Sequence, residues 1–103
     1  MISESKFKSF KEFYPFYLSQ HNKPLTKLFH AFGSICVIAI IALSLVSKNF
    51  KLLYLAPFAG YGFAWISHFF IEKNKPATFK FPLYSFLGDW VMLKDLLIGK
   101  IKL

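Results

Sequence analysis

The sequence predicts an all-α integral membrane protein, a helical hairpin of two transmembrane helices flanked by amphipathic interfacial helices. Composition is the first observation that predicts this class. Of the 103 residues, 55% are hydrophobic, 20% are aromatic and 17% are charged, whereas about a quarter of the residues of a soluble domain carry charge. One domain of this length cannot bury so many aromatic rings from water. We therefore expect residues 1–103 to form a single domain whose apolar surface faces lipid.

Two long uncharged segments are the second observation. Residues 31–47 contain no charged side chain, and as a helix they would extend about 25 Å, close to the thickness of a hydrocarbon core. Residues 52–71 form a second uncharged segment with a stronger membrane signal. A short connection with Lys48 and Lys51 separates the two segments. The sequence thus predicts two spanning helices joined by a tight turn.

The distribution of lysines predicts the orientation of this hairpin. All 13 basic residues are lysines; two lie in the turn, and the other eleven lie before or after the hairpin. By the positive-inside tendency, both termini are expected in the cytoplasm, with the bacterial inner membrane as the expected location and membrane lipids as partners. The net charge of +8 does not indicate a nucleic-acid partner, because the chain lacks the arginines that bind phosphates and bases bidentately.

Apolar residues at three- and four-residue steps predict an interfacial helix on each side of the hairpin. The first covers about residues 5–20, where Pro15 either kinks the helix or restarts it. A break at Asn22-Lys23-Pro24 precedes the first span. The second covers about residues 83–98. Within it, Asp89 follows Gly88 and is expected to play a structural role at a helix start.

Small residues recur every four positions in the second predicted span. They are Ala56, Gly60 and Ala64. Small side chains let membrane helices approach closely, so this row predicts helix packing, either within the hairpin or in a homo-oligomer.

The three histidines and one glutamate form the candidate metal site. His30 precedes the first predicted span and His68 ends the second, so antiparallel packing brings them to one depth. Glu72 follows His68 by one helical turn, and His21 reaches the group if the chain folds back before Pro24. Imidazoles and a carboxylate bind Zn²⁺ or non-haem Fe²⁺. The alternative is that these groups hydrogen-bond to headgroups, water or neighbouring lysines.

Other kinds of chemistry lack their motifs. Cys36 is the one cysteine, so the chain has no CxxC motif and no internal disulfide. HExxH, GxSxG and phosphate-loop motifs are also absent. No nucleotide cofactor is expected.

Several segments resemble a known family, and the most specific of them begins at His68. These segments are Tyr17 to Asn22 (YLSQHN), Leu28 to Gly33 (LFHAFG), Gly60 to Trp65 (GYGFAW), His68 to Ala77 (HFFIEKNKPA), Phe81 to Leu83 (FPL) and Gly88-Asp89. Through them the chain resembles the domain-of-unknown-function 962 family, over about residues 13–97.

The resemblance implies an activity. The family includes a fungal 2-hydroxy fatty acid dioxygenase, an endoplasmic-reticulum enzyme that uses Fe²⁺ and histidines to shorten an acyl chain by one carbon. By resemblance, His21, His30 and His68 match the family's histidines and Glu72 its carboxylate. The resemblance thus implies an Fe²⁺ cofactor and a 2-hydroxy fatty acyl substrate. The present sequence is much shorter than the fungal enzyme, with two spans where the longer proteins have more, so we expect ligands or acyl-channel walls supplied by the extra segments to be absent.

A second hypothesis does not involve catalysis. In it the hairpin binds lipid or assembles into oligomers through Ala56, Gly60 and Ala64, and the histidines are structural. The two hypotheses differ in the metal content that they predict, because the second predicts no bound metal.

Overall fold

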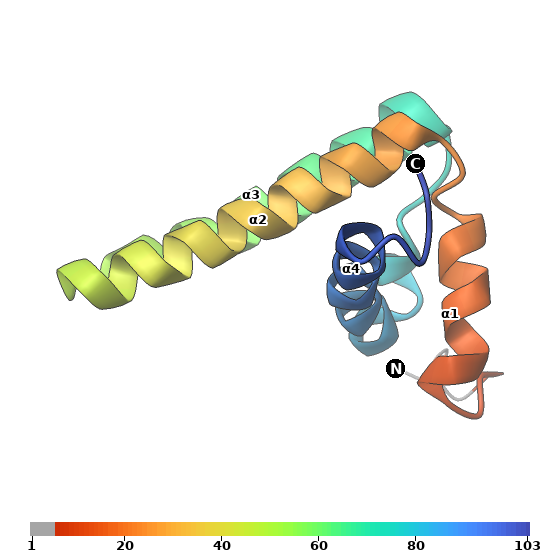
Figure 1. Cartoon of the computed structure of the whole chain (residues 1–103), viewed down its shortest axis with the longest axis horizontal. Helices are drawn as coiled ribbons and strands as arrows, with labels where there is room; N and C mark the ends of the chain where they lie inside the picture. Colours follow the sequence, from red (N-terminus) through yellow and green to blue (C-terminus); the bar gives the residue numbers. More distant parts are fainter. Residues whose placement is uncertain (1–5) are drawn as a thin grey trace.

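A computed structural model of the chain describes residues 6–103, and these residues contain helices but no strand. The predicted all-α class is therefore confirmed for the described part. Residue 5, where the first interfacial helix was predicted to begin, lies outside it. The helices form two groups: a long hairpin, and a pair of helices packed at the open end of that hairpin (Figure 1).

The first helix, α1, spans Phe10–Ser19 and begins later than predicted. The Ser9 hydroxyl starts it by accepting a hydrogen bond from the backbone N–H of Glu12 at 3.2 Å. Pro15 lies inside the helix without ending it. Because Pro15 is exposed, water can satisfy the carbonyl that its missing N–H would have bonded.

The first arm of the hairpin is α2, Pro24–Ser47, which begins at a proline in its first turn, as the sequence predicts. It ends where Lys48 adopts a left-handed conformation, with φ 58°. Among the described helices, α2 alone is long and apolar enough to cross a membrane. Only 22% of its most apolar window is buried within the described structure.

The second arm changes helix type along the span predicted over residues 52–71. It consists of a 3₁₀ segment η2 (Phe50–Leu55), an α-helix α3 (Ala56–Ile66) and a π-helical segment η3 (Ser67–Glu72). Pro57 explains the first change, because its ring removes one backbone donor and disfavours helix on its N-terminal side. The π-turns carry His68, and such turns occur frequently at functional sites. The division leaves a second spanning helix unconfirmed.

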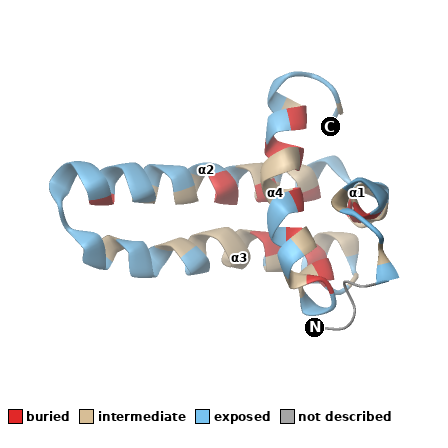
Figure 2. Cartoon of the chain, turned by 90° about the horizontal axis from the view of Figure 1, so that it is seen from below, coloured by how far each residue is buried: buried red, intermediate tan, exposed pale blue. Residues whose placement is uncertain are grey.

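Close backbone contact joins the two arms, which lie side by side and antiparallel (Figures 1 and 2). A Cβ atom added at Gly33 would lie 3.1 Å from the carbonyl oxygen of Ala59, and one added at Gly60 would lie 3.2 Å from Val37. The predicted small-residue packing therefore occurs within the hairpin. Oligomerisation through the same row remains a prediction.

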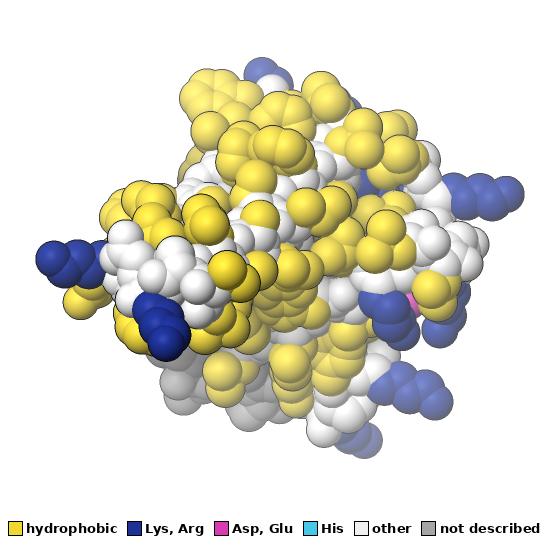
Figure 3. All heavy atoms as spheres, turned by 60° about the vertical axis from the view of Figure 1, so that its left-hand side comes forward, with side chains coloured by type: hydrophobic (Ala, Val, Ile, Leu, Met, Phe, Trp, Pro, Cys, Tyr) yellow, Lys and Arg dark blue, Asp and Glu magenta, His cyan; other side chains and the backbone are white. Residues whose placement is uncertain are grey.

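Large apolar side chains cover the outside of the hairpin. Figure 3 shows them gathered over much of one face, with lysines mostly at its margin. On α2 the exposed ones are Leu25, Leu28, Phe32, Ile35, Ile38, Ile41, Leu43, Leu45 and Val46. Such a continuous apolar surface is typical of a protein that faces lipid or a partner.

The last long helix, α4 (Pro82–Leu97), follows a short turn η4 (Ala77–Phe79) and packs against both α1 and α2. Its core with α1 consists of Phe13, Tyr17, Phe81 and Met92. Gly88 permits this packing, because a Cβ there would lie 2.8 Å from the Tyr17 ring. The close approach places the next residue, Asp89, beside Tyr17 and the hairpin.

Candidate metal centre

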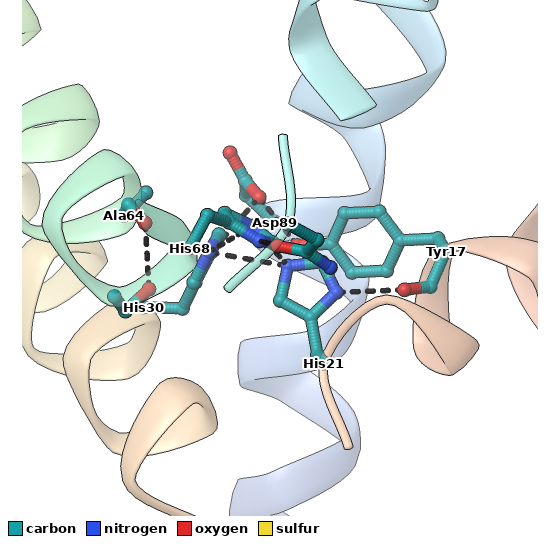
Figure 4. A network of polar contacts seen from close by, with 8 residues as sticks. Tyr17, His21, His30, Ala64, His68 and Asp89 are labelled. Carbon is teal, nitrogen blue, oxygen red and sulfur yellow. Dashed lines mark hydrogen bonds and ion pairs between the residues drawn. The ribbon is translucent and has the colours of Figure 1, made fainter. Parts of the chain in front are cut away.

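The structure brings the three predicted histidines together at the open end of the hairpin (Figure 4). His21 lies just after α1, His30 lies on α2, and His68 lies on η3. Each pair of Nε2 atoms is 3.1 Å apart. All three side chains are buried, with exposed fractions of 1%, 6% and 2% respectively. The antiparallel hairpin and the return of the chain before Pro24 therefore produce the predicted cluster.

The opposite ring nitrogen of each histidine faces a hydrogen-bond acceptor. His21 Nδ1 is 2.6 Å from the Tyr17 carbonyl oxygen. His30 Nδ1 is 3.3 Å from a carboxylate oxygen of Asp89. His68 Nδ1 is 2.8 Å from the side-chain oxygen of Asn74. The orientation of the Asn74 amide follows from its own nitrogen, which donates to the Gln20 carbonyl at 3.2 Å.

These partners determine the tautomer of each ring. A carbonyl or carboxylate oxygen can only accept a hydrogen bond, so each Nδ1 carries the N–H and donates the hydrogen bond. A neutral imidazole has one N–H, so when all three rings are neutral each Nε2 points a lone pair at the other two. Three lone pairs 3.1 Å apart have no proton to share, and they repel unless a cation lies among them.

The spacing of the three nitrogens fits one metal ion. The centre of an equilateral triangle with 3.1 Å sides is about 1.8 Å from each corner, slightly less than the roughly 2.1 Å of a metal–imidazole bond. Among the described residues, these histidines form the group of potential ligands whose atoms all lie within 4.8 Å of one another. Imidazole ligands suit zinc, copper, iron and nickel.

Glu72, the fourth predicted ligand, has a different position. Its carboxylate accepts a hydrogen bond from the backbone N–H of Lys23 at 2.5 Å, and the Lys23 ammonium donates to the Ile71 carbonyl at 3.1 Å. The carboxylate thus lies at the start of α2, where it satisfies a backbone donor and interacts favourably with the helix dipole. Glu72 fixes the loop that follows His21 and lies outside the histidine group.

Asp89 and Tyr17 belong to the site, although the sequence assigned Asp89 only a structural role and Tyr17 no role of its own. The Tyr17 hydroxyl donates to the same Asp89 oxygen that faces His30. Burial raises the pKa of Tyr17 well above its usual value, and the negative charge of Asp89 raises it further. Tyr17 thus stays protonated, and its hydroxyl donates a hydrogen bond to Asp89. Carboxylates that orient metal-binding histidines in this way raise the basicity of the ligand.

Burial and the neighbouring rings keep His21 neutral in the absence of a metal. Burial lowers the pKa of His21 well below its usual value of 6.5, and the neighbouring His30 and His68 lower it further. A neutral histidine is the form that binds metal.

Two cavities meet at His30 and Asp89. The smaller has a volume of about 10 Å³ and is lined by all three histidines. Two of its other lining residues, Trp65 and Ser85, have a buried polar atom without a hydrogen-bond partner among the described residues. The larger has a volume of about 410 Å³ and extends along the hairpin. One small and one large cavity therefore adjoin the histidine cluster.

Comparisons with known proteins identify the family. A search of curated proteins finds no match, and a search of solved structures finds none either. Residues 7–101 match the family described as 2-hydroxy-palmitic acid dioxygenase Mpo1-like. The match covers nearly the whole chain and confirms the resemblance predicted from the histidine segments. The chain belongs to the Mpo1-like family.

Proposed function

We propose that this protein is an integral membrane, Fe²⁺-dependent dioxygenase that acts on 2-hydroxy fatty acids. The observation that carries the proposal is the convergence of three histidine Nε2 atoms at 3.1 Å in a buried site. The name of the family supports the reaction and the substrate class. Three protein ligands leave further coordination positions open. Bound Fe²⁺ would supply the oxygen chemistry at those positions.

The residues of the chain have separate roles in this proposal. His21, His30 and His68 hold the ion. The Tyr17 carbonyl, Asp89 and Asn74 hold the rings in the metal-binding tautomer through their Nδ1 atoms. The buried position of the imidazoles excludes bulk water from the reacting groups. The proposal assigns metal binding to the three histidines and not to Glu72.

The proposal also places the hairpin in a membrane, with the histidine end at the cytoplasmic surface of a bacterial inner membrane. Its support is the exposed apolar surface of α2 and the small buried share of that helix. In this arrangement α1 and α4 lie at the interface, where most lysines meet anionic headgroups.

Metal content tests the proposal first. The protein, without a histidine tag, would be purified anaerobically in mild detergent, reconstituted with Fe²⁺ and analysed by elemental mass spectrometry. We expect about one iron per chain, lost in a His30→Ala, His68→Ala double variant and retained in Glu72→Gln. The loaded protein should then consume 2-hydroxypalmitate with O₂. Absence of bound metal would contradict the proposal and favour the non-enzymatic hairpin.

A further inference from the structure

The 410 Å³ cavity runs from the histidine cluster along the inside of the hairpin. One face of α2 lines it, because His30, Ser34, Val37 and Ile41 recur at steps of four, three and four residues. The opposite wall comes from the second arm, and α4 adds Phe86, Asp89 and Trp90. The cavity is therefore lined by three elements near the histidines and by the two hairpin arms farther away.

The two ends of this cavity differ in polarity. At one end lie His30 and Asp89, which also belong to the candidate metal centre. At the other end lie Ile41 and Leu53, close to the turn of the hairpin. The walls between them are mainly apolar, with Val37, Ala56 and Gly60 among them. A ligand that fits has one polar end and an extended apolar tail.

The length of the cavity limits that tail. Along α2, His30 and Ile41 are about 16 Å apart at 1.5 Å per residue. Half of a hydrocarbon core, the depth that one lipid chain occupies, is about 15 Å. The direction agrees as well, since the polar end lies at the lysine-rich end of the hairpin and the apolar end points toward the middle of the proposed bilayer.

We infer that this cavity binds the acyl chain of a long, straight-chain 2-hydroxy acid, and that Gly60 and Leu53 determine the chain length it accepts. The inference rests on the proposed function and adds the place and direction of the substrate. The carboxylate and the 2-hydroxyl lie at the His30 end. The tail extends between α2 and the second arm and ends near Leu53.

Gly60 provides a sharp test because the same helix offers a matched control. A Cβ atom at Gly60 would lie 3.2 Å from Val37, which also lines the cavity, whereas a Cβ at Gly62 would meet nothing within 4 Å. Gly60→Leu should therefore obstruct the cavity, and Gly62→Leu should leave it open. The two variants change helix composition equally.

The experiment uses iron-loaded protein in detergent and a chain-length series of 2-hydroxy acids that displace a fluorescent fatty acid. Blocking the contacts of about two methylene groups weakens binding about tenfold. We expect Gly60→Leu to lose that factor for long chains, to lose less for medium chains and to keep its iron. Gly62→Leu should bind like the unmodified protein. Equal effects of both variants, or an unchanged preference in Gly60→Leu, would overturn the inference.

Leu53→Trp provides a second test that disturbs helix packing less, because Leu53 is 40% exposed. A larger side chain at the apolar end should shift the preference toward shorter acids. Leu55→Trp, which changes a neighbouring residue outside the cavity, is its control. Failure here is distinguishable from failure of the proposed function. Chain-length-dependent binding without turnover would support the cavity assignment and contradict the proposed dioxygenase activity. Turnover without any change in chain-length preference would support the activity and contradict the cavity assignment.

Discussion

His30 Nδ1 on α2 lies 3.3 Å from the carboxylate of Asp89 on α4. This contact links two helices that are far apart in the sequence. The same carboxylate oxygen accepts the hydrogen bond of Tyr17 on α1. The Asp89 side chain therefore links α1, α2 and α4. The other nitrogen of the His30 ring, Nε2, points into the histidine cluster. The fold and the candidate metal site are therefore linked at this position, and this link leads to specific predictions.

Asp89→Asn should weaken metal binding without removing the ligands. The amide has lost the negative charge that favours a proton on His30 Nδ1, and its NH₂ group can face the ring and stabilise the wrong tautomer. Changes of this kind typically reduce metal affinity about 10- to 100-fold. Competition with a chelator of known affinity would measure the effect.

Asp95→Asn is the matched control for this change. Asp95 is a second acid of α4 and is buried, but its carboxylate accepts from Tyr14 at 2.8 Å and lies outside the histidine group. We expect its metal affinity to equal that of the unmodified protein. Equal affinities in both variants would show that Asp89 does not orient His30.

Gly88→Ala should destabilise the packing of α1 on α4. The added methyl group would lie 2.8 Å from the Tyr17 ring, and overpacking of this kind costs about 1–3 kcal/mol. Gly62→Ala, where the new methyl group meets nothing within 4 Å, should be neutral or stabilise by about 0.5–1 kcal/mol because alanine favours helix. Unfolding in detergent compares the two. A Gly88→Ala protein as stable as Gly62→Ala would contradict the packing described.

Glu72→Gln should keep full metal stoichiometry and lower the stability of the fold. The carboxylate accepts from the Lys23 N–H and not from a histidine of the cluster. The Gln oxygen can still accept this hydrogen bond, so only the favourable charge at the helix start is lost, which costs about 0.3–1 kcal/mol. Metal analysis together with thermal unfolding separates the two effects. Loss of metal from a folded Glu72→Gln protein would restore Glu72 as a ligand.

The metal-free protein should lose stability as the pH falls below about 6.5. The pKa of His21 is lowered in the folded state by burial and by the neighbouring histidines. The unfolded chain then binds a proton that the folded protein does not, so acidification favours unfolding. Above that pH both states are neutral at this residue and its effect vanishes. Unfolding curves measured from pH 7.5 to 5 check the sign, and unchanged stability over that range would refute it.

Sequence patterns predicted the histidine group because hairpin geometry follows from hydropathy and turn position. Two uncharged segments with a short connection place His30 and His68 at one level, and the break before Pro24 lets His21 return. Hydropathy does not register a change of helix type. Pro57 and the π-turns at His68 therefore divide the second arm in a way that the sequence average conceals.

Contacts between distant residues account for what the sequence did not reveal. Glu72 sits one turn after His68, which suggests a shared face, but the free N–H at the start of α2 competes for its carboxylate. Asp89 has no partner nearby in sequence, and its role arises only when Gly88 lets α4 approach Tyr17. Such roles depend on packing across the whole domain.

X-ray absorption at the iron edge would test the central claim most directly. The Fe²⁺-reconstituted protein should show an iron bound by three imidazole nitrogens at about 2.1 Å, with the remaining positions filled by light, exchangeable ligands. The His30→Ala protein, prepared in parallel, should lack this signal. Iron bound without imidazole, or the same spectrum from His30→Ala, would contradict the assignment of His21, His30 and His68 as the metal centre.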